Sequence, residues 1–279
     1  MKQWICRKLL HRSVLIVSSS FFAFTSAQAT CRLESGPERS VSRVIDSETL
    51  ALDDGSAVRL IGALAPRASD TEAADGKWPP EEAARGALDA LATGKAVRLK
   101  FGGERKDRHG HWLAHVFLRD GKDGETWVQA HMLQSGHARV YALSGNRACM
   151  GELTTAEAVA RSGHLGLWLE PAYHERAAIP ARDIMRYEGT FQVVTGVVDS
   201  VRSSRDVIRL RLGTDWRRDL TVSIRTKDRD LLGAIGGDAK ALNGRTIEAR
   251  GWIGRRSGSF AGPDIDVSTA GDLKVVEPK

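Results

Sequence analysis

Short stretches of alternating apolar and polar residues, separated by turns, recur along this chain and constrain its fold more than any other feature. The dipeptide Asp54-Gly55 is a hairpin turn signal between two of them. Five short strands of this kind predict a small barrel of the OB type. In the first half of the chain the predicted strands are residues 42–46, 50–53, 58–62, 96–101 and 112–118.

Helical patterns lie between and after these strands. A helix begins at Pro79-Pro80-Glu81-Glu82, because proline and acidic residues suit the first turn, and it runs to residue 92 before Gly94. Two further helices are predicted at residues 128–134 and 154–161. The first half is therefore expected to be mainly β with packed helices, an α+β fold.

The second half repeats the strand-rich pattern. Residues 171–185 contain two prolines and no sustained period, which is typical of a linker. We expect three mature segments: a domain at 30–170, this linker, and a second OB-like five-stranded barrel at 186–279. The second barrel's predicted strands are residues 190–199, 207–212, 220–224, 246–252 and 265–267, with a helical stretch at 227–235.

The first 29 residues have the pattern of a secretory signal peptide. Four basic residues precede a short apolar core, and Ala27-Gln28-Ala29 is a small-residue cleavage pattern. The apolar stretch is too short to span a membrane comfortably, although an uncleaved anchor is the alternative. We expect cleavage near Ala29, a periplasmic or secreted location, and no transmembrane segment in the mature chain.

Charge is uneven along the mature chain. The full sequence has a formal net charge of +6, but the predicted signal peptide holds four basic residues and no acidic one. Residues 182–279 contain 18 basic and 14 acidic residues, so this half is the better candidate for a polyanion partner. The candidate nucleic-acid-binding residues are Arg217, Arg218, Trp216, Arg255 and Arg256.

Alternation also places Arg209 and Arg211 on one exposed face, whereas Trp252 is assigned to the core. The alternative for this half is a spacer or protein-docking domain with a solvated arginine face.

Two cysteines remain after the predicted cleavage, Cys31 and Cys149. In an oxidising compartment such a pair predicts a disulfide. The alternative is two free buried thiols, and neither cysteine has the spacing of a redox or metal site.

Four segments in order resemble the staphylococcal nuclease (thermonuclease) family: VRLIGALAPR, KDRHGHWLAHVF, LQSGHARVY and AEAVARSGHLGLW. The resemblance spans residues 41–170. It implies an OB-fold barrel with packed helices. Family members cleave nucleic acid phosphodiesters with calcium, two arginines and a carboxylate that activates water.

The resemblance also implies a degenerate catalytic site. Glu48 stands at the first metal carboxylate and Arg59 at the first phosphate-binding arginine, but Leu64 replaces the second metal carboxylate. Arg67 replaces the general-base glutamate, and His111 falls where the second phosphate arginine is expected. We expect Arg67 to form an ion pair with Glu48 in the vacated pocket.

Other roles for these residues remain open. Asp46 and Glu48 are taken to reach one metal together only if the backbone bulges. Three histidines either hold a transition metal or are loop and surface histidines: His109, His111 and His115. In a strand, His111 and His115 are about 13 Å apart.

Histidine is the residue type suited to acid–base catalysis near neutral pH, so His111 is a candidate replacement acid or base. Arg59 either binds phosphate or simply pairs with an acid.

The sequence therefore favours a thermonuclease-like envelope protein with impaired catalysis, which binds nucleic acid or an envelope protein. No cofactor is expected if the site is inactive. If the nuclease site is active, we expect it to bind calcium. Whether the chain is an enzyme stays open at this point, and residual metal-dependent nuclease activity is the alternative function.

Overall fold

The computed structural model describes residues 31–70, 76–121, 124–215, 217–256 and 262–276. Its contacts group Cys31–Lys279 into one compact unit, separate from Met1–Thr30. The predicted signal peptide and its cleavage position near Ala29 lie outside the described residues. Among the described residues, no helix is long and apolar enough to cross a membrane.

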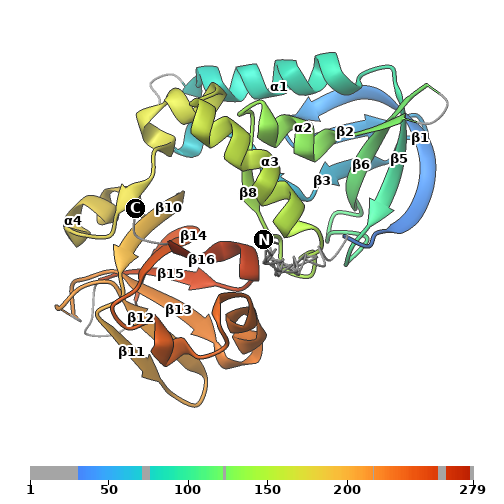
Figure 1. Cartoon of the computed structure of the whole chain (residues 1–279). Helices are drawn as coiled ribbons and strands as arrows, with labels where there is room; N and C mark the ends of the chain where they lie inside the picture. The colour runs from blue at the N-terminus through green and yellow to red at the C-terminus, as the bar shows by residue number, and fades with distance from the viewer. Residues whose placement is uncertain (1–30, 71–75, 122–123, 216, 257–261, 277–279) are drawn as a thin grey trace, which may run out of the picture. The chain divides into compact units, whose positions relative to one another are not determined.

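Five strands of the first half close into a ring (Figure 1). Each pairs with its neighbours in the order β1, β2, β3, β6, β5 and back to β1; the β3–β6 pair is parallel and the other pairs are antiparallel. This confirms the five predicted strands and the mixed character of the fold. The strands are β1 (Glu34–Asp46), β2 (Thr49–Leu52), β3 (Ala57–Leu60), β5 (Ala96–Phe101) and β6 (Trp112–Asp120).

The structure agrees with the predicted turn between β2 and β3 and differs from the prediction at the start of β1. Gly55 has a φ of +81°, as expected for a glycine in the turn between β2 and β3. Strand β1 begins at Glu34, well before the predicted start at residue 42. The predicted end of this strand at residue 46 is confirmed, and Ser47-Glu48 forms the turn into β2.

Three helices and three short strands surround the ring. The first helix has prolines at its start and buries Ala84, Leu88 and Ala92, which lie on one face at helical spacing. The third helix is longer than predicted at both ends. These elements are α1 (Pro79–Ala92), α2 (Val128–Gln134), α3 (Met150–Gly163), β4 (Gly62–Leu64), β7 (Gly124–Trp127) and β8 (Arg139–Tyr141).

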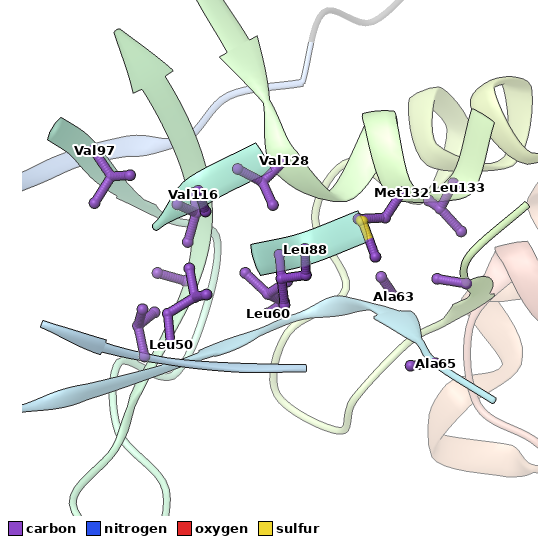
Figure 2. Close-up of a cluster of buried hydrophobic side chains, with 14 of the residues drawn as sticks. Leu50, Leu60, Ala63, Ala65, Leu88, Val97, Val116, Val128, Met132 and Leu133 are labelled. Carbon is purple, nitrogen blue, oxygen red and sulfur yellow. The ribbon is translucent and has the colours of Figure 1, made fainter. Parts of the chain in front are cut away.

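The core of this half lies between the ring and the helices. Figure 2 shows side chains of the strands, among them Leu50, Leu60 and Val116, facing Leu88 of α1 and Met132 of α2. Since each fully buried aliphatic side chain contributes about 1.5–3 kcal/mol relative to exposure, this cluster stabilises the ring and the segments that leave it.

The second half forms an eight-stranded sheet. Strand β12 pairs antiparallel with β13, β13 parallel with β15, β15 antiparallel with β14, and β14 antiparallel with β10. From β11 to β10 this sheet has one parallel pair among antiparallel ones, in the same order as the ring of the first half. The strands are β9 (Arg176–Ala177), β10 (Phe191–Val197), β11 (Ser200–Ser203), β12 (Val207–Arg211), β13 (Thr221–Arg225), β14 (Thr246–Arg255), β15 (Pro263–Val267) and β16 (Leu273–Val276).

Several predicted elements of this half have different bounds. The strand predicted at residues 190–199 corresponds to β10, and β9, β11 and β16 were not predicted. The stretch predicted as helical at 227–235 is a 3₁₀ helix, Thr226–Ile235. The remaining helix is α4 (Ala181–Ile184), and the other 3₁₀ helices are Ala68–Asp70, Gly166–Leu169, Pro171–Tyr173, Met185–Tyr187, Ala239–Leu242 and Ala270–Asp272.

The segment predicted as a linker contains ordered contacts. Its strand β9 pairs in parallel with β10, and Tyr173 is buried in a cluster with Trp168 and Val193. Glu157 of α3 and Arg250 of β14 form an ion pair with 2.7 Å between Oε2 and Nη1, and both side chains are at most 2% exposed. Buried contacts therefore join α3 to the second sheet.

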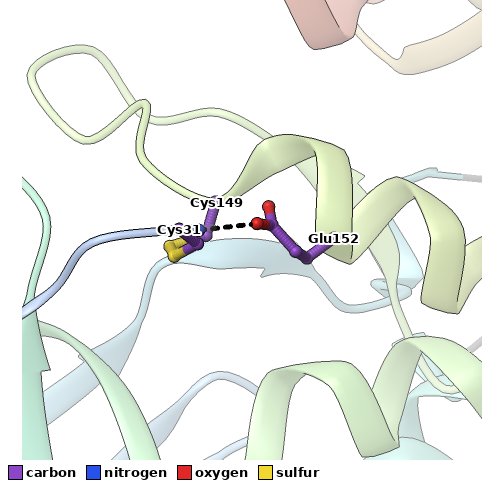
Figure 3. Close-up of a disulfide and its surroundings, with 3 residues drawn as sticks. All are labelled: Cys31, Cys149 and Glu152. Atoms are coloured by element: carbon purple, nitrogen blue, oxygen red, sulfur yellow. Dashed lines mark hydrogen bonds between the residues drawn. A yellow bond between two sulfur atoms is a disulfide. The ribbon is translucent and has the colours of Figure 1, made fainter. Parts of the chain in front are cut away.

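The predicted disulfide is confirmed. Cys31 and Cys149 are bonded with their Cα atoms 4.9 Å apart, across 118 residues of sequence. Figure 3 shows the backbone N–H of Cys31 donating to Glu152, at 2.9 Å from N to Oε1. The bond attaches the residues before β1 to the start of α3.

Candidate functional site

A pocket of about 530 Å³ contains four of the five positions that the resemblance assigned to the catalytic site, Glu48, Arg59, Arg67 and His111. It is bounded by the turn between β1 and β2, by β3, by the segment after β4, by the start of α1 and by the loop before β6. Its lining residues include Asp46, Glu48, Arg59, Arg67, Glu81, Asp107, His109 and His111.

The Glu48 carboxylate accepts four hydrogen bonds at the base of this pocket. Oε1 accepts from the backbone N–H of Ala65 at 2.9 Å and from Arg67 Nη2 at 2.9 Å. Oε2 accepts from the same Arg67 nitrogen at 2.8 Å and from Arg59 Nη2 at 3.2 Å. The predicted ion pair between Arg67 and Glu48 is thereby confirmed, with the Glu48 side chain only 8% exposed.

The local backbone holds Glu48 in this position. Asp46 Oδ1 accepts from the backbone N–H of Glu48 at 2.8 Å, a side-chain contact that is typical of a tight turn. The backbone carbonyl of Glu48 accepts from the N–H of Leu60 at 2.8 Å. Asp46 therefore supports the turn with one of its oxygens.

Arg59 reaches the pocket from the middle of β3. Its neighbours Val58 and Leu60 face the core, so alternation directs Arg59 to the opposite face. Leu64 on β4 is buried and apolar, and it is absent from the lining of the pocket. The position that the resemblance assigns to a second metal carboxylate thus offers no oxygen.

His111 is held by a carboxylate on the other side of the pocket. Its Nδ1 lies 3.2 Å from Asp107 Oδ2. Partial burial opposes the ionisation of Asp107, but the backbone N–H groups of His109 and His111 donate to its Oδ1 and hold its pKa below the ordinary value. Asp107 was assigned no role from the sequence. Aspartate side chains in turns commonly accept from backbone N–H groups two residues further on, and this could have indicated its contact with His109.

His115 does not belong to this pocket. It was predicted as a surface histidine or as part of a three-histidine metal site, but its side chain is fully buried and its ring packs edge-on against Trp127, with centroids 5.2 Å apart. Burial lowers the pKa of His115 to about 4. Among the described residues no group of three His, Cys, Asp or Glu side chains is arranged to hold a metal ion.

The candidate nucleic-acid-binding residues of the second half are engaged in different ways. Arg255 pairs with Glu188 at 2.6 Å, and Arg256 Nη1 donates to Thr221 Oγ1 at 2.7 Å. Arg218 is largely exposed, and its guanidinium lies 3.9 Å from Asp215. Arg217 donates its backbone N–H to Asp215, and Trp216 lies outside the described residues.

The assignment of Trp252 to the core is wrong. Its side chain is 39% exposed and packs edge-on against Tyr141 and Phe191. The residue occupies the outward position of β14 between buried Gly251 and Ile253, and large aromatic residues in strands are often partly exposed.

Comparison with known proteins supports the resemblance that the sequence motifs suggested. A relative, the succinoglycan biosynthesis protein ExoI of Rhizobium meliloti (strain 1021), is 32% identical over 140 residues, which cover 48% of this chain and 66% of the relative. The chain thus spans just under two thirds of that relative's length. The family model described as "Staphylococcal nuclease homologue" matches residues 57–170, a range that includes Arg59, Leu64, Arg67 and His111 and begins after Glu48. Residues 57–170 of this chain thus match the staphylococcal nuclease homologue family, whose domain the relative shares.

Proposed function

We propose that this chain is a nuclease-type protein with an impaired catalytic site, which binds nucleic acid without efficient hydrolysis. The observation that supports this most is the saturation of Glu48 by Arg59, Arg67 and a backbone N–H. Three donor nitrogens engage both oxygens of this carboxylate, so a metal ion would have to displace an arginine to bind it. The residues present therefore do not fit a calcium site.

The positive charge of Arg67 strengthens this argument. A cation that already neutralises Glu48 competes with a divalent metal for the same carboxylate. The same substitution removes the expected water-activating glutamate, and loss of a general base typically lowers a rate by about 10²–10⁴. We therefore propose that no resident cofactor is used.

We further propose that the second half is an OB-like barrel and that the protein acts outside the cytoplasm. The order of strand pairs in the second sheet supports the first point, because it matches the order in the ring of the first half. The disulfide supports the second, because such bonds persist in oxidising compartments. Binding to an envelope protein is the alternative partner class.

Cleavage of single- and double-stranded DNA by the purified protein tests the proposal. It is measured with calcium and with chelator, beside the variant Arg59→Ala. We expect no calcium-dependent turnover above that of the variant. Calcium-dependent cleavage that Arg59→Ala abolishes would contradict the proposal.

One observation favours a second candidate function, residual phosphodiester hydrolysis. His111 is oriented by Asp107 in the pocket that contains Arg59, which is the arrangement of a positioned acid or base. If cleavage is found, this candidate predicts its loss in His111→Ala and its retention in His131→Ala, a control on the exposed side of α2. Equal activity of the two variants would exclude a role for His111.

A further inference from the structure

Two adjacent strands of the second sheet, β11 and β12, present arginines on one face. Strands β11, β12 and β13 lie side by side in antiparallel pairs (Figure 1). On β12, Ile208 and Leu210 point into the core, so Arg209 and Arg211 lie on the outer face. On β11, Arg202 is paired directly opposite Arg209.

The pairing of Arg202 with Arg209 is unfavourable for the isolated protein. Like charges directly opposite each other on two strands are destabilising, because their Cβ atoms lie only about 4.5–5.5 Å apart. Within the part of the chain that the structure describes, neither arginine forms an ion pair. Both side chains are exposed, so their guanidinium groups are accessible from solvent.

One carboxylate, Asp264 of β15, interacts electrostatically with Arg209 of this face. Asp264 of β15 accepts a hydrogen bond from Ser223 Oγ at 2.8 Å. Burial raises the pKa of Asp264, and both Arg209 and Arg256 act in the opposite direction. Arg211 and Arg256 extend the basic face towards β15, since Arg256 contacts Thr221, which is paired with Arg211.

The chemistry of the face indicates which feature of a nucleic acid it contacts. Arginine binds phosphate through two parallel hydrogen bonds, a geometry that lysine lacks. The sequences SVRS, VIRLR and TVSIR of the three strands contain no aromatic residue on which a base could stack. The face therefore suits the phosphodiester backbone and offers no platform for bases.

Resting on the proposed nucleic-acid binding, we propose that the outer face of β11 and β12, centred on Arg202 and Arg209, binds the phosphodiester backbone of a nucleic acid. This surface differs from the sequence-predicted set at Arg217, Arg218, Arg255 and Arg256. In that set, Arg255 already forms an ion pair with Glu188, and Arg256 donates a hydrogen bond to Thr221.

The test compares two double variants with the same change of charge. Arg202→Glu/Arg209→Glu alters the proposed face, and Arg182→Glu/Arg186→Glu alters exposed arginines near α4. Fluorescence anisotropy with labelled single- and double-stranded oligonucleotides is measured in chelator over a range of salt concentrations. Thermal unfolding of each variant confirms that it is folded.

We expect Arg202→Glu/Arg209→Glu to weaken binding at least tenfold and the control to weaken it less than threefold. For a single strand the slope of log K against log salt should fall by about 1.4, because each lost phosphate contact removes about 0.7. Equal losses in the two double variants would overturn the proposed face and leave nucleic-acid binding standing.

Two other outcomes identify different failures. A wild-type protein that binds neither oligonucleotide would overturn the proposed function itself. Preferential binding of polygalacturonate, measured by competition with the oligonucleotide, would replace nucleic acid with an anionic polysaccharide as the partner. Cleavage in the separate calcium assay does not affect this result, because binding is measured in chelator.

Discussion

At the scale of single residues, Arg67 determines the chemistry of the pocket. Its Nη2 contacts both oxygens of Glu48, at 2.9 and 2.8 Å. Removing either partner would leave the other charge partly buried, whereas the pair together is neutral. The position that the resemblance assigns to a water-activating acid therefore carries a group that holds the remaining acid in place.

A second residue-scale feature, the burial of His115, makes stability depend on pH. The folded state keeps this imidazole neutral down to a pKa of about 4, compared with an ordinary value of 6.5. Above pH 6.5 both states are neutral, and between pH 6.5 and 4 only the unfolded state binds the proton. Stability is therefore lost as the pH falls through this window.

We predict that His115→Leu removes part of this pH dependence. Between pH 7 and pH 4.5 the wild type should lose about 2 kcal/mol more unfolding free energy than the variant, because one pKa unit corresponds to about 1.4 kcal/mol. Guanidinium chloride unfolding at the two pH values measures the difference. Parallel losses in both proteins would show that His115 is protonated in the folded state or does not contribute.

The sequence predicted some of these residue positions and missed others for a physical reason. The Arg67–Glu48 pair was predictable, because a cation and an acid were assigned to the same pocket. His115 was not, because residues 113–116 of β6 are buried on both faces of the strand and leave no alternation to detect. Asp107 was missed because its role depends on a turn that brings it back to His111.

At the scale of elements, the disulfide connects β1 with α3. A bond that closes a loop of 118 residues restricts the unfolded chain, and such bonds typically contribute about 2–4 kcal/mol. We predict that Cys31→Ser/Cys149→Ser lowers the unfolding free energy by about this amount, measured against the wild type under reducing and oxidising conditions. The wild type should lose the same stability on reduction, and an unchanged midpoint would contradict the prediction.

Element bounds were predictable where apolar alternation was regular. Strands β2, β5 and β12 were predicted within one or two residues, because each alternates and ends at a turn. The early part of β1 was not predicted, since its exposed residues between 34 and 40 are polar and are held by pairing with β5. Strand β9 was missed because two residues carry no detectable period.

At the scale of the whole molecule, a buried ionic network joins α3 to the second sheet. Glu157 accepts from Arg250 Nη1 at 2.7 Å and from the backbone N–H of Val140 at 2.7 Å. Burial alone would lower the pKa of Arg250, but the Glu157 and Glu248 carboxylates raise it above its ordinary value. The two carboxylates therefore hold Arg250 in its charged form.

We predict that Glu157→Gln destabilises the protein by roughly 3 kcal/mol, because it leaves Arg250 with less compensation in a buried position. The control is Glu175→Gln, which makes the same chemical change in an exposed carboxylate that pairs with Arg161. Surface pairs contribute about 0–1 kcal/mol, so this variant should stay near the wild type. Chemical unfolding measures both, and equal effects would contradict a special role for the buried pair.

The central claim, that Glu48 is engaged by Arg67 and does not bind calcium, is tested most directly by calcium titration calorimetry. The wild type is compared with Glu48→Gln, which removes the carboxylate charge at the base of the pocket. We predict that the two titrations coincide, because both Glu48 oxygens are already engaged by arginine and backbone donors. Calcium binding by the wild type that Glu48→Gln abolishes would contradict the claim, since it would show that Arg67 releases the carboxylate to a metal.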